Sequence, residues 1–246
     1  MGIGTPIIAF DTIESTNKMA AELLSLSKVQ HGAVILAREQ TAGRGQRGRT
    51  WTSQPGLDLT ASVVLRPRAL RAEDQFILGK MAALAVAEVT RRLVPANVRI
   101  KWPNDVLVER KKIAGILIKN DIVGELVQSS VLGIGINANS SSFPEELTAT
   151  SVLLETGSMV DLNELLAQLC TALDHRWTAW ESGDNGLATE YSDQLWARGR
   201  WADMLLDDHP VVARPLDVDA HGRLIVEHEG GEVRVYGLDR LRFAPR

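Results

Sequence analysis

The sequence is poor in cysteine and contains no long hydrophobic run. Its 246 residues include a single cysteine, Cys170, which excludes an internal disulfide and fits a reducing compartment. No apolar stretch approaches the roughly 20 residues that a membrane-spanning helix requires, and the N-terminus shows no secretory signal pattern. We therefore expect a cytoplasmic protein without a membrane partner, in which Cys170 is a buried apolar side chain rather than a reactive thiol.

Aromatic residues and an excess of positive charge are also lacking. Aromatic side chains make up 5% of the chain, and 27 lysines and arginines face 31 aspartates and glutamates, for a formal net charge of -4. General nucleic-acid-binding domains carry a basic excess and stack bases on aromatic rings, so the composition argues against that class. With 45% hydrophobic and 24% charged residues, the chain is long enough for one large core and a small appendage.

Glycine and arginine, by contrast, are concentrated in one short stretch. Residues 43–49 read Gly-Arg-Gly-Gln-Arg-Gly-Arg. Glycine lets backbone N–H groups approach a ligand closely, and arginine offers a planar fork of donors to a carboxylate or a phosphate. Such runs also occur in flexible RNA-binding tails. Because apolar segments at 33–37 and 57–65 flank this run, we expect an ordered anion-binding loop between two strands.

Hydrophobic patterning predicts a mixed α+β domain at 1–199 and a small β-barrel at 200–246. In the first domain we expect strands at 7–10, 32–38, 59–65, 98–102, 106–108, 113–118 and 126–136. Helices are predicted after residues 15–17 and at 72–94, 151–156, 162–180 and 186–197. The barrel strands are predicted at 201–206, 211–218, 223–229 and 232–236. The serine-rich stretch that begins at Ser140 is expected to be mobile.

Two polar motifs are candidates for ligand binding, and each has a plain structural alternative. Ser15, Thr16 and Asn17 follow the first strand and either contact a polar ligand or only cap the next helix. Asn104 and Asp105 end the stretch Lys-Trp-Pro-Asn-Asp. A carboxylate at this position suits Mg²⁺, whereas an Asx turn is the structural alternative.

A lysine and two glycines complete the set of candidates. Lys112 lies in the charged turn 109–112 of a predicted hairpin, where a side chain is usually just solvated. Gly133 and Gly135 alternate along a predicted strand. Glycine in a strand often marks the close approach of a ligand or backbone, and a bulge is the alternative.

In this order and spacing, the motifs resemble those of the biotin-protein ligases that biotinylate the carrier protein of acetyl-CoA carboxylase. The matching stretches are Ser-Thr-Asn at 15–17, Gln-x-Ala-Gly-Arg-Gly-x-Arg-Gly-Arg-x-Trp at 40–51, Lys-Trp-Pro-Asn-Asp at 101–105, Lys-Ile-Ala-Gly-Ile-Leu at 112–117 and Gly-x-Gly-x-Asn at 133–137. The resemblance covers about 7–139, and the C-terminal barrel more loosely. It implies a mixed-sheet catalytic domain of the class II synthetase and biotin ligase type at 1–199, followed by an SH3-like barrel at 200–246.

The resemblance also implies a reaction with ATP, Mg²⁺ and biotin. Biotin would be activated as biotinyl-5'-AMP and then transferred to a lysine of the biotin carboxyl carrier protein domain, with a homodimer left open. The catalytic residues would be Lys112, Arg44 and Arg49. The biotin site would comprise Ser15, Thr16, Asn17, Gln40, Arg44, Gly45, Gln46, Trp51, Lys112, Gly115 and Gly133. The ATP site would comprise Arg49, Asn104, Lys112, Gly135, Asn137 and Arg242, with Asp105 as the Mg²⁺ ligand. The loop from Ser140 to Thr150 would order over adenine.

The sequence departs from the family pattern at two places. Many of these ligases begin with a winged helix-turn-helix domain that represses biotin genes, but here the Ser-Thr-Asn motif comes almost at once, so we expect a ligase that does not bind DNA. The family loop commonly reads Gly-Arg-Gly-Arg-Arg-Gly-Arg, whereas this chain has Gln46. One cation is therefore absent where the acyl-phosphate intermediate must be retained.

Two rival functions remain. A lipoate-protein ligase shares the core fold and the adenylation chemistry, but Lys-Trp-Pro-Asn-Asp combined with the glycine and arginine loop favours biotin. The second rival is a non-catalytic RNA-binding module, which the acidic net charge and the scarcity of aromatic residues disfavour.

Overall fold

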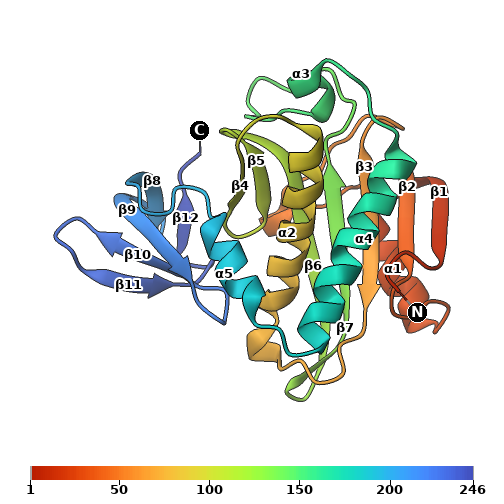
Figure 1. Ribbon diagram of the computed structural model, residues 1–246, viewed down its shortest axis with the longest axis horizontal. Helices are drawn as coiled ribbons and strands as arrows, with labels where there is room; N and C mark the ends of the chain where they lie inside the picture. Colours follow the sequence, from red (N-terminus) through yellow and green to blue (C-terminus); the bar gives the residue numbers. More distant parts are fainter. Residues whose placement is uncertain (1, 246) are drawn as a thin grey trace.

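The larger part of the molecule is built on one seven-stranded sheet (Figure 1). The computed structural model describes residues 2–245. The strands are β1 (Ile7–Ile13), β2 (Val34–Gln40), β3 (Leu59–Leu65), β4 (Val98–Lys101), β5 (Asp105–Val108), β6 (Lys111–Val123) and β7 (Leu126–Ile136), in the spatial order β1-β2-β3-β7-β6-β5-β4. β1 pairs with β2 in parallel, and the other neighbouring pairs are antiparallel. The prediction of a mixed sheet in an α+β fold is therefore confirmed.

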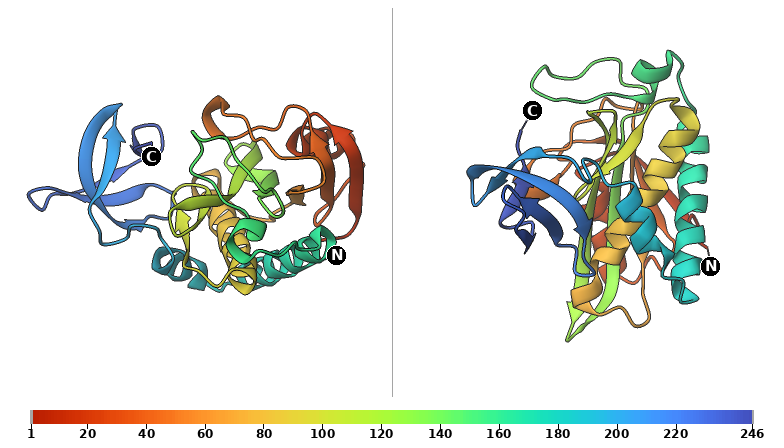
Figure 2. Two further views of the ribbon diagram at one scale, coloured as in Figure 1. Left: turned by 90° about the horizontal axis from the view of Figure 1, so that it is seen from above. Right: turned by 60° about the vertical axis from the view of Figure 1, so that its left-hand side comes forward.

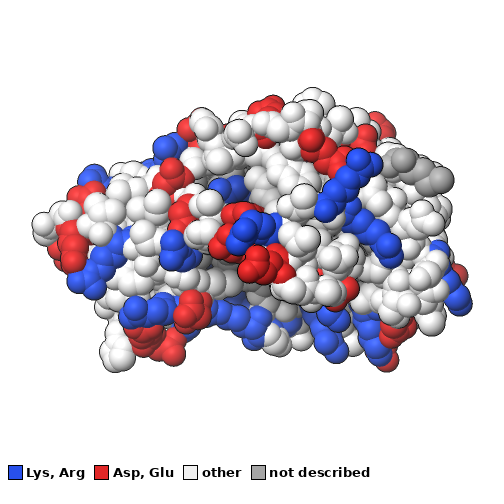
Figure 3. Space-filling view, turned by 90° about the horizontal axis from the view of Figure 1, so that it is seen from below, with Lys and Arg blue, Asp and Glu red and all other residues white. Residues whose placement is uncertain are grey.

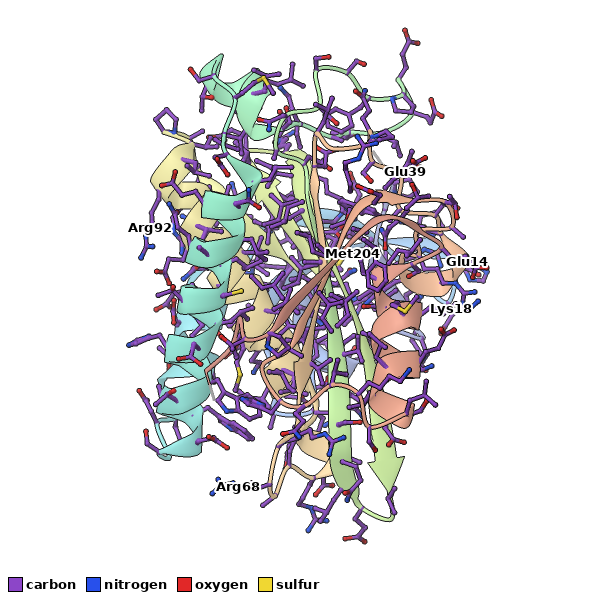
Figure 4. The ribbon with its side chains drawn as sticks, turned by 90° about the vertical axis from the view of Figure 1, so that its right-hand side faces the viewer. Glu14, Lys18, Glu39, Arg68, Arg92 and Met204 are labelled. Carbon is purple, nitrogen blue, oxygen red and sulfur yellow. The ribbon has the colours of Figure 1, made fainter. Side chains whose placement is uncertain are left out.

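Helices cover both faces of this sheet. Figure 4 shows α1 (Thr16–Ser25) and α4 (Leu162–Glu181) on opposite sides of the strands. The α4 face also carries α2 (Phe76–Leu93) and α5 (Gly186–Asp193), and the short α3 (Val152–Thr156) lies at one end of the sheet (Figure 1). The α1 face has its own small core, centred on Ala20, Ile35 and Val64. Both faces of the sheet therefore carry packed helices.

The prediction of a buried central helix is confirmed by α2. Its middle residues, 81–87, are at most 1% exposed. The helix begins at Phe76, later than predicted, because residues 72–74 form a 3₁₀ turn. Among residues 2–245, no helix is long and apolar enough to cross a membrane. Cys170 on α4 is buried, and burial raises the pKa of its thiol to about 11, which fits the apolar role predicted for it.

The C-terminal part is a separate five-stranded sheet at the end of the molecule opposite β1 (Figure 2). Its strands are β8 (Ala202–Leu206), β9 (His209–Val218), β10 (Leu224–His228), β11 (Val233–Tyr236) and β12 (Leu241–Phe243), in the order β11-β10-β9-β8-β12. In the described part of the chain β11 and β12 do not pair with each other, so this antiparallel sheet is open rather than a closed barrel. Met204 and Leu224 nevertheless join the same hydrophobic core as α2.

The glycine and arginine run forms an ordered loop between β2 and β3, as predicted. The prediction that the chain becomes mobile at Ser140 is wrong for that residue. Ser140 is buried, and its hydroxyl donates to the buried carboxylate of Asp58 at 2.6 Å. The backbone oxygen of Ser140 also accepts from the Ser151 hydroxyl at 2.6 Å. The two ends of the segment 141–150 are therefore held together by the hydrogen bond between Ser140 and Ser151.

Charges of both signs are interspersed on the face shown in Figure 3. Lysine and arginine side chains lie next to aspartate and glutamate there, and no broad area carries a single sign. A face of this kind does not provide the continuous basic surface that binds nucleic acid without sequence preference.

Candidate functional site

A small pocket lies where the centre of the large sheet meets the start of α1 and the glycine and arginine loop. Its lining residues come from segments far apart in the sequence, namely Ser15, Thr16, Asn17, Gln40, Arg44, Gly45, Trp51, Thr60, Asn104, Lys112, Gly115, Ile116, Leu117, Gly133, Ile134 and Gly135. Most of the residues assigned to a site by the family resemblance are thus brought together. The pocket combines an uncharged polar end with a charged end.

The uncharged end is held by a network of hydrogen bonds around the start of α1. The Thr16 N–H and hydroxyl donate to Gln40 Oε1 at 2.8 and 3.1 Å. The Ser62 hydroxyl lies 2.7 Å from Thr16 Oγ1 and 2.6 Å from Asn17 Oδ1. Asn17 Nδ2 donates to the Leu117 carbonyl at 2.9 Å. These side chains are therefore fixed by one another before any ligand arrives.

Ser15 decides between the two interpretations of the Ser-Thr-Asn motif. It occupies the N-cap position of α1, but its side chain makes no capping hydrogen bond. Ser15 is buried and lines the pocket. A buried hydroxyl that does not cap its helix favours the ligand-binding interpretation over the purely structural one.

Three glycines keep the floor of the pocket free of Cβ atoms. Gly133 and Gly135 project to the same face of β7, and Gly115 on β6 pairs directly with Gly135. A Cβ at Gly133 would lie 2.4 Å from Asn17 Oδ1, and one at Gly135 would lie 2.4 Å from the Trp51 ring. Only glycine permits these approaches without displacement of the neighbours, which favours the close-approach interpretation over a bulge.

The loop at 41–58 folds back on itself and brings Trp51 over these glycines. The Trp51 N–H donates to the Gly43 carbonyl at 3.0 Å, and the Gly45 N–H donates to the Arg49 carbonyl at 2.7 Å. The indole Nε1 of Trp51 is buried without a hydrogen-bond partner. The cavity that remains is about 40 Å³, and Trp51 is part of its lining. The Trp51 ring therefore covers Gly115 and Gly135 on the floor of the pocket.

The charged end is centred on an ion pair between two strands. Lys112 Nζ lies 2.7 Å from Asp105 Oδ1 and 5.5 Å from the centre of the Trp51 ring. Lys112 is the second residue of β6 rather than part of the turn tip, because the turn is confined to residues 109–110. Its position on a strand, with its side chain about one-third exposed, explains why it lines the pocket instead of being fully solvated.

The backbone of Lys112 is held on both sides. Its N–H donates to the Thr148 carbonyl at 2.8 Å, and its carbonyl accepts from the Thr150 N–H at 2.9 Å. Asn137 Nδ2 donates to the Thr150 carbonyl at 3.0 Å and to the Lys112 carbonyl at 3.4 Å. Asn137 is therefore engaged in supporting Lys112 and does not line the pocket.

Other predicted site residues are placed differently. Asn104 lines the pocket while its side chain donates to the Ile116 carbonyl at 2.8 Å. Gln46 and Arg49 belong to the same loop as Arg44 but are not part of the lining. Arg242 lies on β12, where it pairs with Asp208 at 2.6 Å. The structure thus brings Asn104 and Arg44 to the pocket and leaves Gln46, Arg49, Asp105 and Arg242 outside its lining, although Asp105 contacts Lys112.

The pocket also contains residues that the sequence analysis missed. Thr60, Ile116, Leu117 and Ile134 line it, and Ser62 supports it. Thr60 and Ser62 alternate along β3, so two hydroxyl side chains on one face of an otherwise apolar strand were the available signal.

Comparisons with known proteins agree with one another. The profile of the Biotin/lipoate A/B protein ligase family matches residues 9–137. The bifunctional ligase/repressor BirA of Bacillus subtilis is 31% identical over 96% of this chain and 74% of that protein. The biotin--[acetyl-CoA-carboxylase] ligase of Mycobacterium tuberculosis is 32% identical over 97% of this chain and 91% of that protein.

A solved structure shows the same fold. The biotin protein ligase from Aquifex aeolicus, in complex with biotin and ATP, superimposes with a TM-score of 0.81 at 24% sequence identity, covering 98% of this chain and 100% of that one.

Proposed function

Because the chain belongs to the biotin/lipoate A/B protein ligase family, we propose that it is an ATP-dependent biotin--[acetyl-CoA-carboxylase] ligase. It activates biotin as biotinyl-5'-AMP and transfers the biotinyl group to a lysine of the biotin carboxyl carrier protein domain. The observation that carries this proposal is the pocket itself. A pre-formed polar network at one end leads over a glycine floor to a lysine and a carboxylate at the other.

The first step joins two anions, the biotin carboxylate and ATP, so the site must offset their repulsion. A biotin carboxylate oxygen attacks the α-phosphorus of ATP, the bond to the pyrophosphate oxygen breaks, and pyrophosphate leaves. In the second step the uncharged lysine amine attacks the biotinyl carbonyl, AMP departs as the leaving group, and the amine loses a proton. Positioned cations are the main requirement of the first step, because they offset repulsion between the carboxylate and the phosphates.

The uncharged end of the pocket suits the ureido ring of biotin. Such a ring presents both N–H donors and a carbonyl acceptor, and a site for it needs groups of both kinds within apolar walls. Ser15, Thr16, Asn17 and Gln40 supply these groups, and Ile116 and Ile134 supply apolar surface. Gly115, Gly133 and Gly135 leave room for the bicyclic ring and the chain that carries the carboxylate.

Lys112 is the residue proposed to bridge the biotin carboxylate and the α-phosphate. Its Nζ is paired with Asp105. Biotin and ATP bring new negative charge, so Lys112 can exchange Asp105 for the substrates, and Asp105 then needs another cation as its partner. Arg44 adds a second cation at the pocket lining. Arg49, in the same loop, would supply a third.

Asp105 would then be free to hold Mg²⁺. One carboxylate beside a triphosphate is sufficient, because Mg²⁺ keeps several waters and binds substrate phosphates. In the described part of the chain no three or more His, Cys, Asp or Glu side chains are grouped so that they could hold a metal ion. When bound, Mg²⁺ would neutralise phosphate charge.

The remaining roles complete the proposal. Gly45 and Gln46 would close over biotin with Trp51, while Asn104, Asn137 and Arg242 would serve the nucleotide. The segment from Ser140 to Thr150 would cover adenine, and the C-terminal sheet would be of the SH3-like type. A cytoplasmic location is part of the same proposal, and a homodimer is left open.

Lipoate is the alternative substrate, because the family profile covers both kinds of ligase. Incubation with ATP and either biotin or lipoate separates the two. We expect pyrophosphate release and the mass of the acyl-adenylate with biotin, and neither with lipoate. Release with lipoate alone would replace the proposed substrate, and release with neither acid would contradict the ligase function.

A further inference from the structure

The turn that joins β9 to β10, residues 219–222, packs against the larger part of the molecule. Within the turn, the Gly222 N–H donates to the Asp219 carbonyl at 3.2 Å, and the Arg223 N–H donates to Asp219 Oδ1 at 2.8 Å. Gly222 has φ +82, in the left-handed region, and a Cβ there would lie 2.3 Å from the Phe76 ring on α2. The turn is therefore a compact unit that presses directly on α2.

Two hydrogen-bonding anchors fix the turn from the α2 side. Lys80 is buried, and its Nζ lies 3.4 Å from both the Val218 and the Asp219 carbonyl oxygens. Burial lowers the pKa of Lys80. His221 Nδ1 lies 3.1 Å from the Glu73 carbonyl oxygen just before α2. A buried lysine that points at two strand-end carbonyls marks a fixed interface rather than an incidental contact.

The same turn contacts the Lys-Trp-Pro-Asn-Asp motif. Trp102 is 2% exposed, and its Nε1 donates to the Gly222 carbonyl at 2.9 Å. Two residues further along the chain, Asn104 lines the pocket, and Asp105 pairs with Lys112. The motif therefore contacts the C-terminal sheet through Trp102 and the pocket through Asn104.

We infer that residues 219–222, called here the β9–β10 turn, position the nucleotide end of the active site by holding Trp102, and so fix Asn104 and Asp105 without touching a ligand. This inference rests on the proposed function. Within the C-terminal sheet this role belongs to a turn against Trp102, whereas the family resemblance implies a role for Arg242. The hydrogen bonds of the uncharged end join α1 to β2, β3 and β6, whereas those that hold the turn come from α2, Glu73 and Trp102. A disturbed turn should therefore affect ATP and leave biotin binding unchanged.

Two glycines of the C-terminal sheet provide a matched test. Gly222 and Gly230 both lie in turns and both have positive φ, +82 and +98, but a Cβ at Gly230 would meet nothing within 4 Å. Gly222→Ala and Gly230→Ala therefore carry similar backbone strain, and only the first pushes against Phe76. Trp102→Phe is the gentler variant, because it keeps a buried ring and removes the N–H donor. Trp177→Phe, on α4, controls for the loss of a buried indole.

The measurements are the KM values for ATP and biotin in pyrophosphate release, and calorimetric titration of each variant with a non-hydrolysable ATP analogue. We expect Gly222→Ala to weaken ATP use and analogue binding by about tenfold to a hundredfold, as small misplacements of positioning groups do. Trp102→Phe should act in the same direction by about threefold to tenfold, the cost of leaving one buried acceptor unpaired. The biotin KM should stay at the wild-type value in both variants, and both controls should match the wild type.

Equal ATP affinities in Gly222→Ala and Gly230→Ala would overturn the inference, as would equal losses of ATP and biotin affinity. If Gly222→Ala does not fold, Trp102→Phe against Trp177→Phe gives the same decision. The analogue titration needs no turnover. A wild-type protein that binds the analogue but releases no pyrophosphate with biotin would contradict the proposed function, while the comparison of variants would still decide the role of the turn.

Discussion

The two ends of the pocket are built differently. At the uncharged end, Thr16, Asn17, Gln40 and Ser62 are joined by short hydrogen bonds among themselves. At the charged end, Lys112 is paired with Asp105, while the Trp51 indole Nε1 is buried without a partner. The side chains of the uncharged end satisfy one another's hydrogen bonds. At the charged end, the unpaired Trp51 N–H lowers the stability of the folded protein.

This difference matches the chemistry proposed for each end. Recognition of an uncharged ring requires fixed donors and acceptors, because every group that must be ordered on binding lowers the affinity. Binding of ATP and the activation of a carboxylate require cations that exchange one anionic partner for another. Asp105 neutralises Lys112, and the Trp51 ring packs over Gly135 beside this pair. The comparison therefore predicts separable effects on biotin binding and on adenylate formation.

The largest expected effect comes from the charged end. Lys112→Met removes the cation and keeps a side chain of similar length, so biotin should still bind while adenylate formation falls by about a hundredfold to a thousandfold. Biotin-dependent pyrophosphate release and a biotin titration measure the two quantities separately. Retention of the wild-type rate in this variant would remove Lys112 from the chemistry.

The hydrogen bonds of the uncharged end should be disrupted by the substitution Gly133→Ala, which adds a single carbon. Gly133→Ala places a Cβ where Asn17 Oδ1 now lies 2.4 Å away, so Asn17 must move and its hydrogen bonds to Ser62 and Leu117 are lost. We expect biotin affinity to fall by about tenfold to a hundredfold, the cost of one or two hydrogen bonds to charged or buried groups. Calorimetry with biotin alone checks this, and unchanged biotin affinity would place the ureido ring elsewhere.

Gln46→Arg adds a cation to the glycine and arginine loop. A charge-assisted bond to the acyl-phosphate contributes roughly 1 to 3 kcal/mol, so biotinyl-5'-AMP should dissociate about tenfold more slowly. The native protein should then release more adenylate, seen as biotin on unrelated surface lysines when no carrier is present. Adenylate dissociation from both proteins is the measurement. Equal rates would mean that Gln46 is not where retention is set.

The smallest expected effect comes from removing a single hydroxyl, and two buried serines allow a controlled comparison. Ser62 on β3 and Ser130 on β7 are both fully buried, but the Ser130 hydroxyl has no hydrogen-bond partner. Ser62→Ala should lower biotin affinity by about fivefold, since one neutral hydrogen bond contributes about 1 kcal/mol. Ser130→Ala should leave biotin affinity unchanged. Identical biotin titrations of the two variants would show that the network does not organise the pocket.

Much of this arrangement could be predicted from the sequence, because the motifs lie at strand ends and in loops with recognisable chemistry. Periodicity predicts β3 and β7, and the resemblance gathers Thr16, Gln40 and Lys112 into one site. Ser62 was missed because its role depends on α1, whose start lies 46 residues earlier in the chain. Ser140 was predicted to be mobile from local composition, but Asp58, 82 residues before it, anchors it.

Contacts of this range cannot be derived from local patterns. The hydrogen bond from Trp102 to Gly222 spans 120 residues, and the position of Trp51 over Gly135 depends on how a long loop folds back. The sequence marks which residues carry chemistry, whereas the packing of distant turns and loops decides which of them are already in place.

The claim that the charged end rearranges while the uncharged end is pre-formed is tested most directly by the fluorescence of Trp51. Wild-type protein and Trp51→Phe are each titrated with biotin, then with a non-hydrolysable ATP analogue, and their tryptophan emission is compared. Trp51 is expected to leave its position between Gly135 and Lys112 when the pocket fills, so the wild type should show a change in emission that Trp51→Phe lacks. Saturation by both ligands with no difference between the two proteins would show that Trp51 stays in place and would contradict the account.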